Sequence, residues 1–597
     1  MSTVTSRKST GNPPRVAVTA ALVVLTVCAY GRTLGNDFIV GYDDSSYILS
    51  NPGVLGGLSM GGLSYALTGL CGANWHPLTV LSHQLDVTFF GINPVGHHAV
   101  NIAFHAANVA LLFHVLMRAT GNRGASLCVA MLFAVHPIHV QNVAAVFQRK
   151  DLLSTFFLLV ALREYVKPTR SMVKVTLWCG LGLLAKPMLV TAPALFLLFD
   201  VWPLNRLELS PIGMRRDLAA RVREKLPIIA LSVVFCLTTL WAQSESGAVA
   251  GSDLMPIHLR FLNALLSYAA YLRLLVWPAG LSIFYPYPTE FAITLVALAA
   301  VLLGILTIAV FMTARRHPYA LVGWLWFLGA MVPVIGLVQV GSQAMADRYG
   351  YVPFWGLYIV IAWGAKAVLA RLNVSPRASA VVLGLVVAGL LVRTWIETGY
   401  WRDNVTLWER AAAVTRSNET VHVQLTLIRA ERNELDAALI HAEEAVRLSP
   451  TVIPMSQLAK VYYLLDRIPE AEAKFKAVLA IDPNYSESVL SYGRLLLEFK
   501  RYDEAKQVFA VTNDNAVASM DVARVCMELG AFDLAENYLN RAIELDPQQP
   551  TAYLFLGMAQ EKQNKAADAI RAYEKALTLD ATLSPAQAGL IRLSARR

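Results

Sequence analysis

The stretch FAITLVALAAVLLGILTIAVFM, residues 291–312, contains no charged residue. A helix needs about 20 mostly apolar residues to cross the hydrocarbon core of a bilayer. Similar runs recur between residues 16 and 397, and the whole chain is 56% hydrophobic with a mean hydropathy of +0.47. Soluble domains are roughly 45–50% apolar. The sequence therefore predicts a membrane protein with many spans.

Eleven segments are long and apolar enough to be predicted spans. They are 16–35, 98–117, 125–147, 151–166, 172–187, 188–203, 226–243, 291–312, 318–340, 351–370 and 378–397. A further segment, 261–277, is flanked or interrupted by Arg260 and Arg273, and we interpret it as re-entrant or interfacial.

Basic residues predict the orientation, because cytoplasmic loops of membrane proteins are enriched in Lys and Arg. The N-terminus carries Arg7, Lys8 and Arg15. If it is cytoplasmic and 261–277 does not cross, the basic loops all fall inside; these are 118–123, 163–174, 206–225, 315–316 and 366–377. Eleven spans then place the C-terminal part outside the cytoplasm, together with the charged turn at Arg149 and Lys150.

Charge divides the chain into two parts. Residues 1–417 have a net charge of +14, whereas residues 418–597 have a net charge of −5. The basic residues of the first part lie mostly in short loops between apolar runs, so the positive charge does not indicate nucleic-acid binding. The six cysteines form no C-x-x-C pair and indicate neither a disulfide framework nor a zinc site.

The C-terminal part contains a repeat. The phrases RLSP (447–450), AIDP (480–483) and ELDP (544–547) recur at intervals of 33 and 64 residues, and TLD ends at Asp580. This spacing is typical of the tetratricopeptide repeat, a two-helix unit of about 34 residues whose stacked copies form a concave binding face. We predict about five copies over residues 418–597, a linker at 401–417 and a membrane domain over 1–400. The alternative role for the repeats is that of a spacer.

The first predicted outer loop, about 36–97, carries two adjacent acids, Asp43 and Asp44. They are candidate general bases, and helix capping is the structural alternative. Eight of the twelve histidines lie between His76 and His139. His98, Asn101, His105 and Asn108 form one polar stripe on a helix, for which hydrogen bonding inside the bundle is favoured over metal binding. No cofactor is predicted with certainty, and a divalent metal ion is left open.

Five strings together resemble the transmembrane-and-tetratricopeptide (TMTC) family of protein O-mannosyltransferases. They are YDDSSYILSNP (42–52), WHPLTVLSHQLDVTFFGINPVGHHAVNIAFH (75–105), LFAVHPIHVQNVAAVFQRKDLLS (132–154), LRLLVWPAGLSIFYPYP (272–288) and ADRYGYVP (346–353). The resemblance implies an all-α protein, with a GT-C-like transmembrane helical bundle followed by a tetratricopeptide α-solenoid. It also implies a glycosyltransferase that uses a polyprenyl-phosphate sugar and glycosylates a translocated protein. This chain departs from the family pattern at Gln141, where Glu is usual, and at the turn 148–151, where Asp151 is the substitute carboxylate.

Such a transfer needs particular residue types. A carboxylate must take the proton of the Ser or Thr hydroxyl, and Asp43 or Asp44 fits this role. Fixed cations must neutralise the departing lipid phosphate. Arg348 is the first candidate, followed by Arg149 and Lys150 and then by Lys186. Further candidate site residues are His76, His136, His139, Asp151 and Tyr349.

The sequence thus predicts an inverting membrane glycosyltransferase for Ser or Thr of exported proteins, with repeats that hold the acceptor. The alternatives are a non-catalytic scaffold that recruits partners through its repeats, and a GT-C transferase with a glycan or lipid acceptor. The expected location is a bacterial inner membrane with periplasmic repeats, and the alternative is an endoplasmic reticulum membrane with lumenal repeats.

Overall fold

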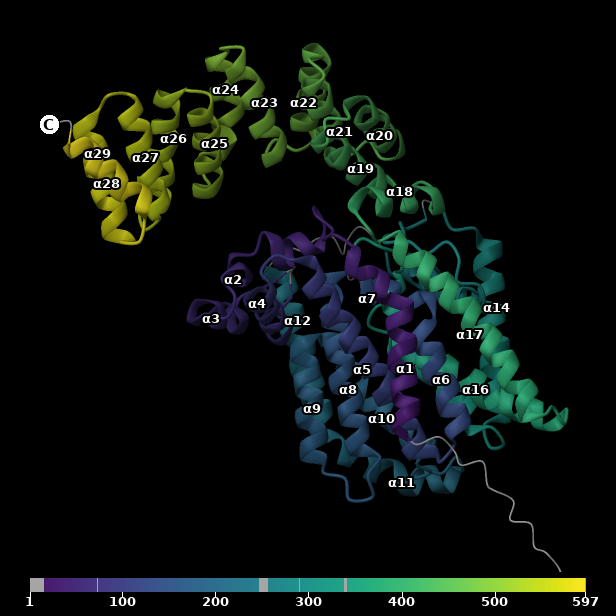
Figure 1. Cartoon of the computed structure of the whole chain (residues 1–597). Coiled ribbons are helices and arrows are strands. Elements are labelled where there is room, and N and C mark those ends of the chain that lie inside the picture. The colour runs from purple at the N-terminus through teal and green to yellow at the C-terminus, as the bar shows by residue number, and fades with distance from the viewer. Residues whose placement is uncertain (1–14, 72–73, 246–255, 289, 338–340, 596–597) are drawn as a thin grey trace, which may run out of the picture. The chain divides into compact units, whose positions relative to one another are not determined.

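The computed structural model describes residues 15–71, 74–245, 256–288, 290–337 and 341–595. Arg7 and Lys8 of the predicted basic N-terminus lie outside these ranges. The chain divides into two compact units, Met1–Arg416 and Ser417–Arg597, and the described residues of both are helical with no named β-strand (Figure 1). This confirms the predicted all-α fold class.

Seven helices of the first unit are long and apolar enough to cross a membrane. They are α1 (Arg15–Tyr30, continued to Gly35 by a 3-10 turn), α5 (Pro94–Thr120), α12 (Leu226–Glu245), α13 (Ile257–Val276), α14 (Ile293–Thr313), α16 (Phe354–Arg371) and α17 (Pro376–Gly399). Lipid offers no hydrogen-bond partner to backbone N–H and C=O groups, so a segment that crosses it forms a helix, in which these groups bond to one another.

The other predicted spans are helical but shorter or broken. Residues 125–147 form α6 (Arg123–Val135) and α7 (Val140–Ala144), which make an eighth span if counted as one helix bent by 53°. The remaining segments are α8 (Arg149–Tyr165), α9 (Met172–Ala185), α10 (Ala192–Val201) and α15 (Pro318–Met331). Pro137 and Pro187 cause two of the breaks, because proline lacks an N–H and restricts the residue before it.

The segment predicted to be re-entrant or interfacial is one unbroken helix, α13, which has the length and hydropathy of a span and contains no re-entrant break. Its polar face is occupied: Asn263 Nδ2 donates to the carbonyl of Ala344 at 2.9 Å, and the Tyr271 hydroxyl donates to that of Ala346 at 2.8 Å. Because α13 has the length of a span, the predicted odd number of spans no longer follows from helix lengths.

One end of the membrane unit carries a basic helix. The basic segment 206–225 contains α11 (Pro211–Glu224), and Figure 1 shows α11 at the end of the bundle where α1 begins. Three short helices lie near the opposite end; they are α2 (Pro52–Leu55), α3 (Met60–Thr68) and α4 (Pro77–Phe90). We call this opposite end, where α1 finishes, the site end.

Residues predicted to be a linker belong to the membrane unit. They form α18 (Asn404–Val414), whose Trp408 is fully buried and packs edge-on against Tyr42 at 5.5 Å between ring centroids. Asn404 Nδ2 also donates to the carbonyl of Val40 at 2.8 Å. The predicted boundary at 400 is therefore too early, because a buried aromatic side chain and these hydrogen bonds extend the unit to Arg416.

The second unit is an array of five helix pairs and a final helix. The pairs are α19 and α20 (Glu419–Glu431, Leu435–Leu448), α21 and α22 (Val452–Leu464, Ile468–Ile481), α23 and α24 (Ser486–Glu498, Tyr502–Phe509), α25 and α26 (Ala516–Glu528, Phe532–Leu545), and α27 and α28 (Pro550–Lys562, Ala566–Leu579), followed by α29 (Ser584–Ser594). Each pair turns at one residue with positive φ; these are Asn433, Asp466, Lys500, Gly530 and Asn564. A residue in the left-handed conformation ends a helix while its last carbonyls still receive hydrogen bonds. The repeat is therefore encoded in its turn residues as well as in its apolar positions.

The burial of α18 can be tested with two truncations in detergent. A chain ending at residue 416 should keep the thermal stability of the membrane unit, whereas one ending at 400 should lose stability. Removal of a buried Trp alone costs roughly 3–5 kcal/mol. Fluorescence-detected gel filtration after heating measures the difference, and equal melting temperatures would contradict the assignment of α18 to the membrane unit.

Candidate active site

Asp44 joins two segments that are far apart in the sequence. Its Oδ2 accepts the backbone N–H of Ile39 and its Oδ1 that of Phe147, both at 2.8 Å. The side chain is 1% exposed, and burial raises the pKa of Asp44 to about 7 against the opposing effect of the two N–H donors. Both oxygens accept backbone hydrogen bonds, so the structure gives Asp44 a structural role and favours its neighbour Asp43 as the candidate general base.

Asp43 is the accessible member of the pair. Its side chain is 39% exposed and its Oδ2 lies 3.9 Å from Lys150 Nζ, at the start of α8. Lys150 is held in turn by Tyr47, whose hydroxyl lies 3.1 Å from Nζ and whose ring centroid lies 4.3 Å from it. Asp43 therefore offers a carboxylate that a substrate can reach, beside a fixed cation.

A pocket near Asp43 and Lys150 is lined by two further cations and a carboxylate. Asp151, Lys186, Arg348 and Tyr349 are among its lining residues. Lys186 Nζ lies 2.5 Å from Asp151 Oδ1, while the buried Asp151 Oδ2 has no hydrogen-bond partner among the residues that the structure describes. The three charged side chains come from the first turn of α8, the break between α9 and α10, and the 3-10 turn η7 (Asp347–Gly350).

Arg348 connects the pocket to Asp43. Burial opposes its charge, but Tyr349, Tyr42, Asp43 and Asp151 hold the pKa of Arg348 above its usual value. Its backbone is fixed at both ends, because its N–H donates to Gln141 Oε1 at 2.9 Å and its carbonyl accepts from Asn142 Nδ2 at 3.0 Å. The site end thus presents a cation next to the accessible carboxylate.

Arg149, also predicted to bind phosphate, does not join this group. It is fully buried, and its guanidinium donates to Asp86 Oδ2 at 2.8 Å, Asn101 Oδ1 at 2.5 Å and Ser82 Oγ at 2.9 Å, and to the carbonyl of His97 at 2.9 Å. Consecutive residues of a helix point about 100° apart. Lys150 therefore faces the site while Arg149 faces the interior.

Comparisons with known proteins cover both units. Tetratricopeptide-repeat models match residues 466–516 and 523–584. Protein O-mannosyl-transferase TMTC3 of Mus musculus is 24% identical over 85% of this chain, and TMTC4 of Homo sapiens is 25% identical over 72%. This chain is similar to the TMTC proteins over most of its length. It spans 57% and 66% of the length of these two relatives. Over a shorter stretch, 24% of the chain, identity to TMTC1 of Mus musculus reaches 35%.

The departure of this TMTC-like chain at Gln141 has a structural explanation. The side-chain oxygen of Gln141 accepts the backbone N–H of Arg348, and its Nε2 lies 3.4 Å from the carbonyl of Ile283. A glutamate could accept the same N–H, so the substitution keeps the contact that positions Arg348. Asp151, predicted as the substitute carboxylate, lies in the pocket with Lys186.

Two of the three candidate histidines lie away from the pocket. His136 Nε2 lies 3.2 Å from the carbonyl of Leu275, and His139 Nε2 lies 2.9 Å from the hydroxyl of Tyr358, so both are hydrogen-bonded in the core. His76 is different: it stacks on Tyr47 at 6.3 Å between centroids. Burial, followed by the charges of Lys150 and Lys186, keeps the pKa of His76 well below its usual value, so it is neutral there.

The polar stripe on α5 forms the hydrogen bonds predicted from the sequence. Asn101 Nδ2 donates to the carbonyls of Val143 and Ala145, and Asn108 Nδ2 donates to that of Leu152. His105 Nδ1 lies 2.7 Å from the Tyr351 hydroxyl. These bonds give three of the four residues of the stripe a partner inside the bundle, where polar groups are otherwise costly.

Two acids at this end were missed by sequence reasoning. Asp347 precedes Arg348 and is buried, with its Oδ1 accepting from the Tyr285 hydroxyl at 2.8 Å; burial raises the pKa of Asp347 to about 8. It anchors η7 to the segment that contains Ser282 and Tyr285. Asp86 lies close to His83 and His97. The i, i+3 spacing of His83 and Asp86 in LSHQLD was the available signal for that cluster.

Asp43 and Asp44 should differ in how replacement by asparagine affects stability. Asp44→Asn should lower the free energy of unfolding by about 1–3 kcal/mol, because an amide nitrogen would face one of two buried N–H donors. Asp43→Asn removes no hydrogen bond to the backbone and should leave stability unchanged. Thermal unfolding of both variants in detergent measures this contrast, which would be disproved by equal losses.

Proposed function

We propose that this protein is an integral membrane glycosyltransferase that moves a sugar from a polyprenyl-phosphate donor to Ser or Thr of translocated proteins. The observation that carries the proposal is the reachable carboxylate of Asp43 beside a pocket lined by Lys186 and Arg348. The names of the TMTC relatives, which describe protein O-mannosyl-transferases, support the choice of reaction.

Each group takes one part of the reaction. Asp43 accepts the proton of the acceptor hydroxyl as its oxygen forms a bond to the anomeric carbon. The bond between that carbon and the phosphate oxygen breaks, and its electron pair leaves with the lipid phosphate. Arg348 and Lys186, with Lys150 as a third cation, stabilise the phosphate charge that grows in the transition state. A single displacement of this kind inverts the anomeric centre.

Orientation and acceptor binding follow from the same proposal. The arginine-rich helix α11 lies at the end of the bundle opposite the site end, which supports an orientation with α11 in the cytoplasm and the site in the periplasm or lumen. A translocated polypeptide would be available on that side. The tetratricopeptide array supplies a face of the kind that binds polypeptide and would hold the acceptor.

The proposal is tested by comparing exported proteins from cells with the wild-type gene, without it, and with Asp43→Asn. Ser and Thr peptides should carry a hexose-sized mass only with the wild type, and the variant's turnover should fall by roughly 10²–10⁴-fold, the usual scale of general-base catalysis. Wild-type modification in the Asp43→Asn cells at normal protein level would refute this mechanism, and its persistence without the gene would refute the function.

Arg348 should affect donor binding as well as turnover, because the phosphate is charged both before and after transfer. Arg348→Ala should weaken binding of the lipid-phosphate sugar and slow transfer, whereas Arg348→Lys should recover part of the binding, since an ammonium replaces only the charge. The matched control is Arg215→Ala, in the exposed face of α11. Donor binding by purified protein measures this, and unchanged affinity in Arg348→Ala would contradict the assignment.

A further inference from the structure

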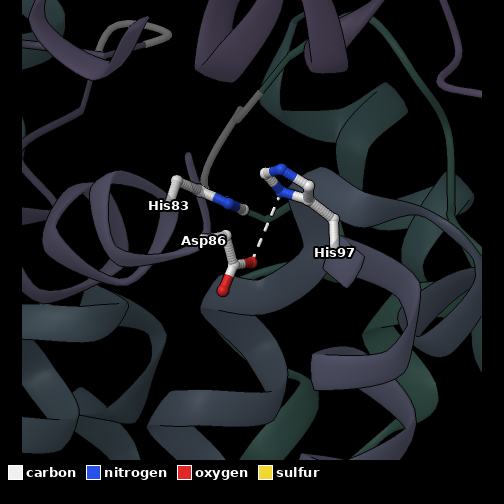
Figure 2. A group of neighbouring side chains, drawn as sticks. All are labelled: His83, Asp86 and His97. Carbon is white, nitrogen blue, oxygen red and sulfur yellow. Dashed lines mark ion pairs between the residues drawn. The ribbon is translucent and has the colours of Figure 1, made fainter. Parts of the chain in front are cut away.

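Three side chains behind the candidate site form a compact cluster. His83 and Asp86 lie one turn apart on α4, and His97 lies in the first turn of α5. All three are buried, and one ligand atom from each lies within 4.8 Å of the other two. Figure 2 shows the two rings and the carboxylate turned toward one another.

The hydrogen bond between His97 Nε2 and the carbonyl of Gly91 determines which nitrogen of the ring carries the proton and which one presents a lone pair to Asp86. Its Nε2 lies 3.1 Å from the carbonyl of Gly91, which can only accept, so Nε2 carries a proton. In the neutral ring, Nδ1 then presents a lone pair to Asp86 Oδ2 at 3.3 Å. The Arg149 guanidinium already lies 2.8 Å from Asp86 Oδ2, but His97 Nδ1 has no hydrogen-bond partner among the described residues. A proton or a cation between Nδ1 and Oδ2 would supply the missing partner.

His83 distinguishes the two possible partners of His97 Nδ1, which are a second proton on the His97 ring and a bound cation. Neither of its ring nitrogens has a hydrogen-bond partner among the described residues, although the side chain is fully buried. Buried polar groups are normally satisfied. A second proton on His97 would satisfy the contact with Asp86 but would leave His83 without a partner. A cation bound by all three residues satisfies the whole cluster.

The surrounding contacts are those expected around a metal ion. Arg149 donates to Asp86 Oδ2 and to the carbonyl of His97, and Gly91 fixes the ring of His97, so both ligands are oriented by outer partners. Ligand atoms of a tetrahedral zinc site lie about 3.3–3.5 Å apart, as Nδ1 and Oδ2 do here. Because Arg149 shares the carboxylate, most of the binding falls to imidazole, which favours Zn²⁺ over Mg²⁺ or Ca²⁺.

We propose that His83, Asp86 and His97 bind one divalent transition-metal ion of the zinc class, which fixes α4 to α5. Thr79 of α4 donates to the carbonyl of Ala185, next to Lys186, and Arg149 precedes Lys150. The metal would therefore hold two cation-bearing segments of the candidate site in place. It is a positioning element and does not depend on the proposed transfer reaction.

The test uses the full-length protein in detergent, purified without a histidine tag. After exposure to Zn²⁺ and gel filtration, elemental analysis should find about one zinc ion per chain, and Co²⁺ should give the visible bands of a tetrahedral site. His83→Gln should reduce metal affinity by about tenfold or more. His83 makes no hydrogen bond to any other described residue, so this variant should fold, as its elution profile will report. Zn²⁺ should also raise the melting temperature of the wild type, and a chelator should reverse the rise.

Two control variants locate the ion. His114→Gln alters a histidine near the other end of α5 and should keep full metal content. His422→Gln breaks a pair in the repeat unit, where two Nδ1 atoms lie 3.2 Å apart, and should also keep it. No bound metal in folded wild-type protein, or metal lost with His422→Gln but kept with His83→Gln, would overturn the proposal.

Discussion

One buried carboxylate holds the site end together. Asp44 accepts a backbone N–H from Ile39 and another from Phe147, so it fixes the chain leaving α1 to the turn that begins α8. A buried N–H without an acceptor costs about 1–3 kcal/mol. Asp43 depends on this contact for its position beside Lys150, since it is the preceding residue in a segment that Asp44 anchors.

Breaks in helices create the pocket. Lys186 lies where α9 ends and Pro187 prevents its continuation, and Asp151 lies one turn into α8. Irregular backbone at such depth is tolerated where protein or a water-filled cavity surrounds it. Lys186 and Asp151 compensate one another's charge, which lowers the cost of keeping both beside apolar helices.

A second polar layer supports the first. Arg149 is fully buried, yet each of its contacts is a fixed acceptor, on α4, α5 or the backbone of His97. Leaving such a charge unpaired would cost several kcal/mol. The arrangement explains why two neighbouring basic residues, Arg149 and Lys150, do different work: one joins helices and the other faces the candidate site.

The sequence by itself determined the apolar helices and the five repeats, because hydropathy and periodicity are local properties. It also predicted that α5 would use its polar stripe for hydrogen bonds. Only the tertiary structure decided which acid is accessible, that Arg149 turns inward, that α18 belongs to the membrane unit and that Asp86 completes a cluster with two histidines. Those outcomes depend on contacts between segments up to several hundred residues apart, such as Tyr42 with Trp408. Such contacts leave no periodic trace in a single sequence.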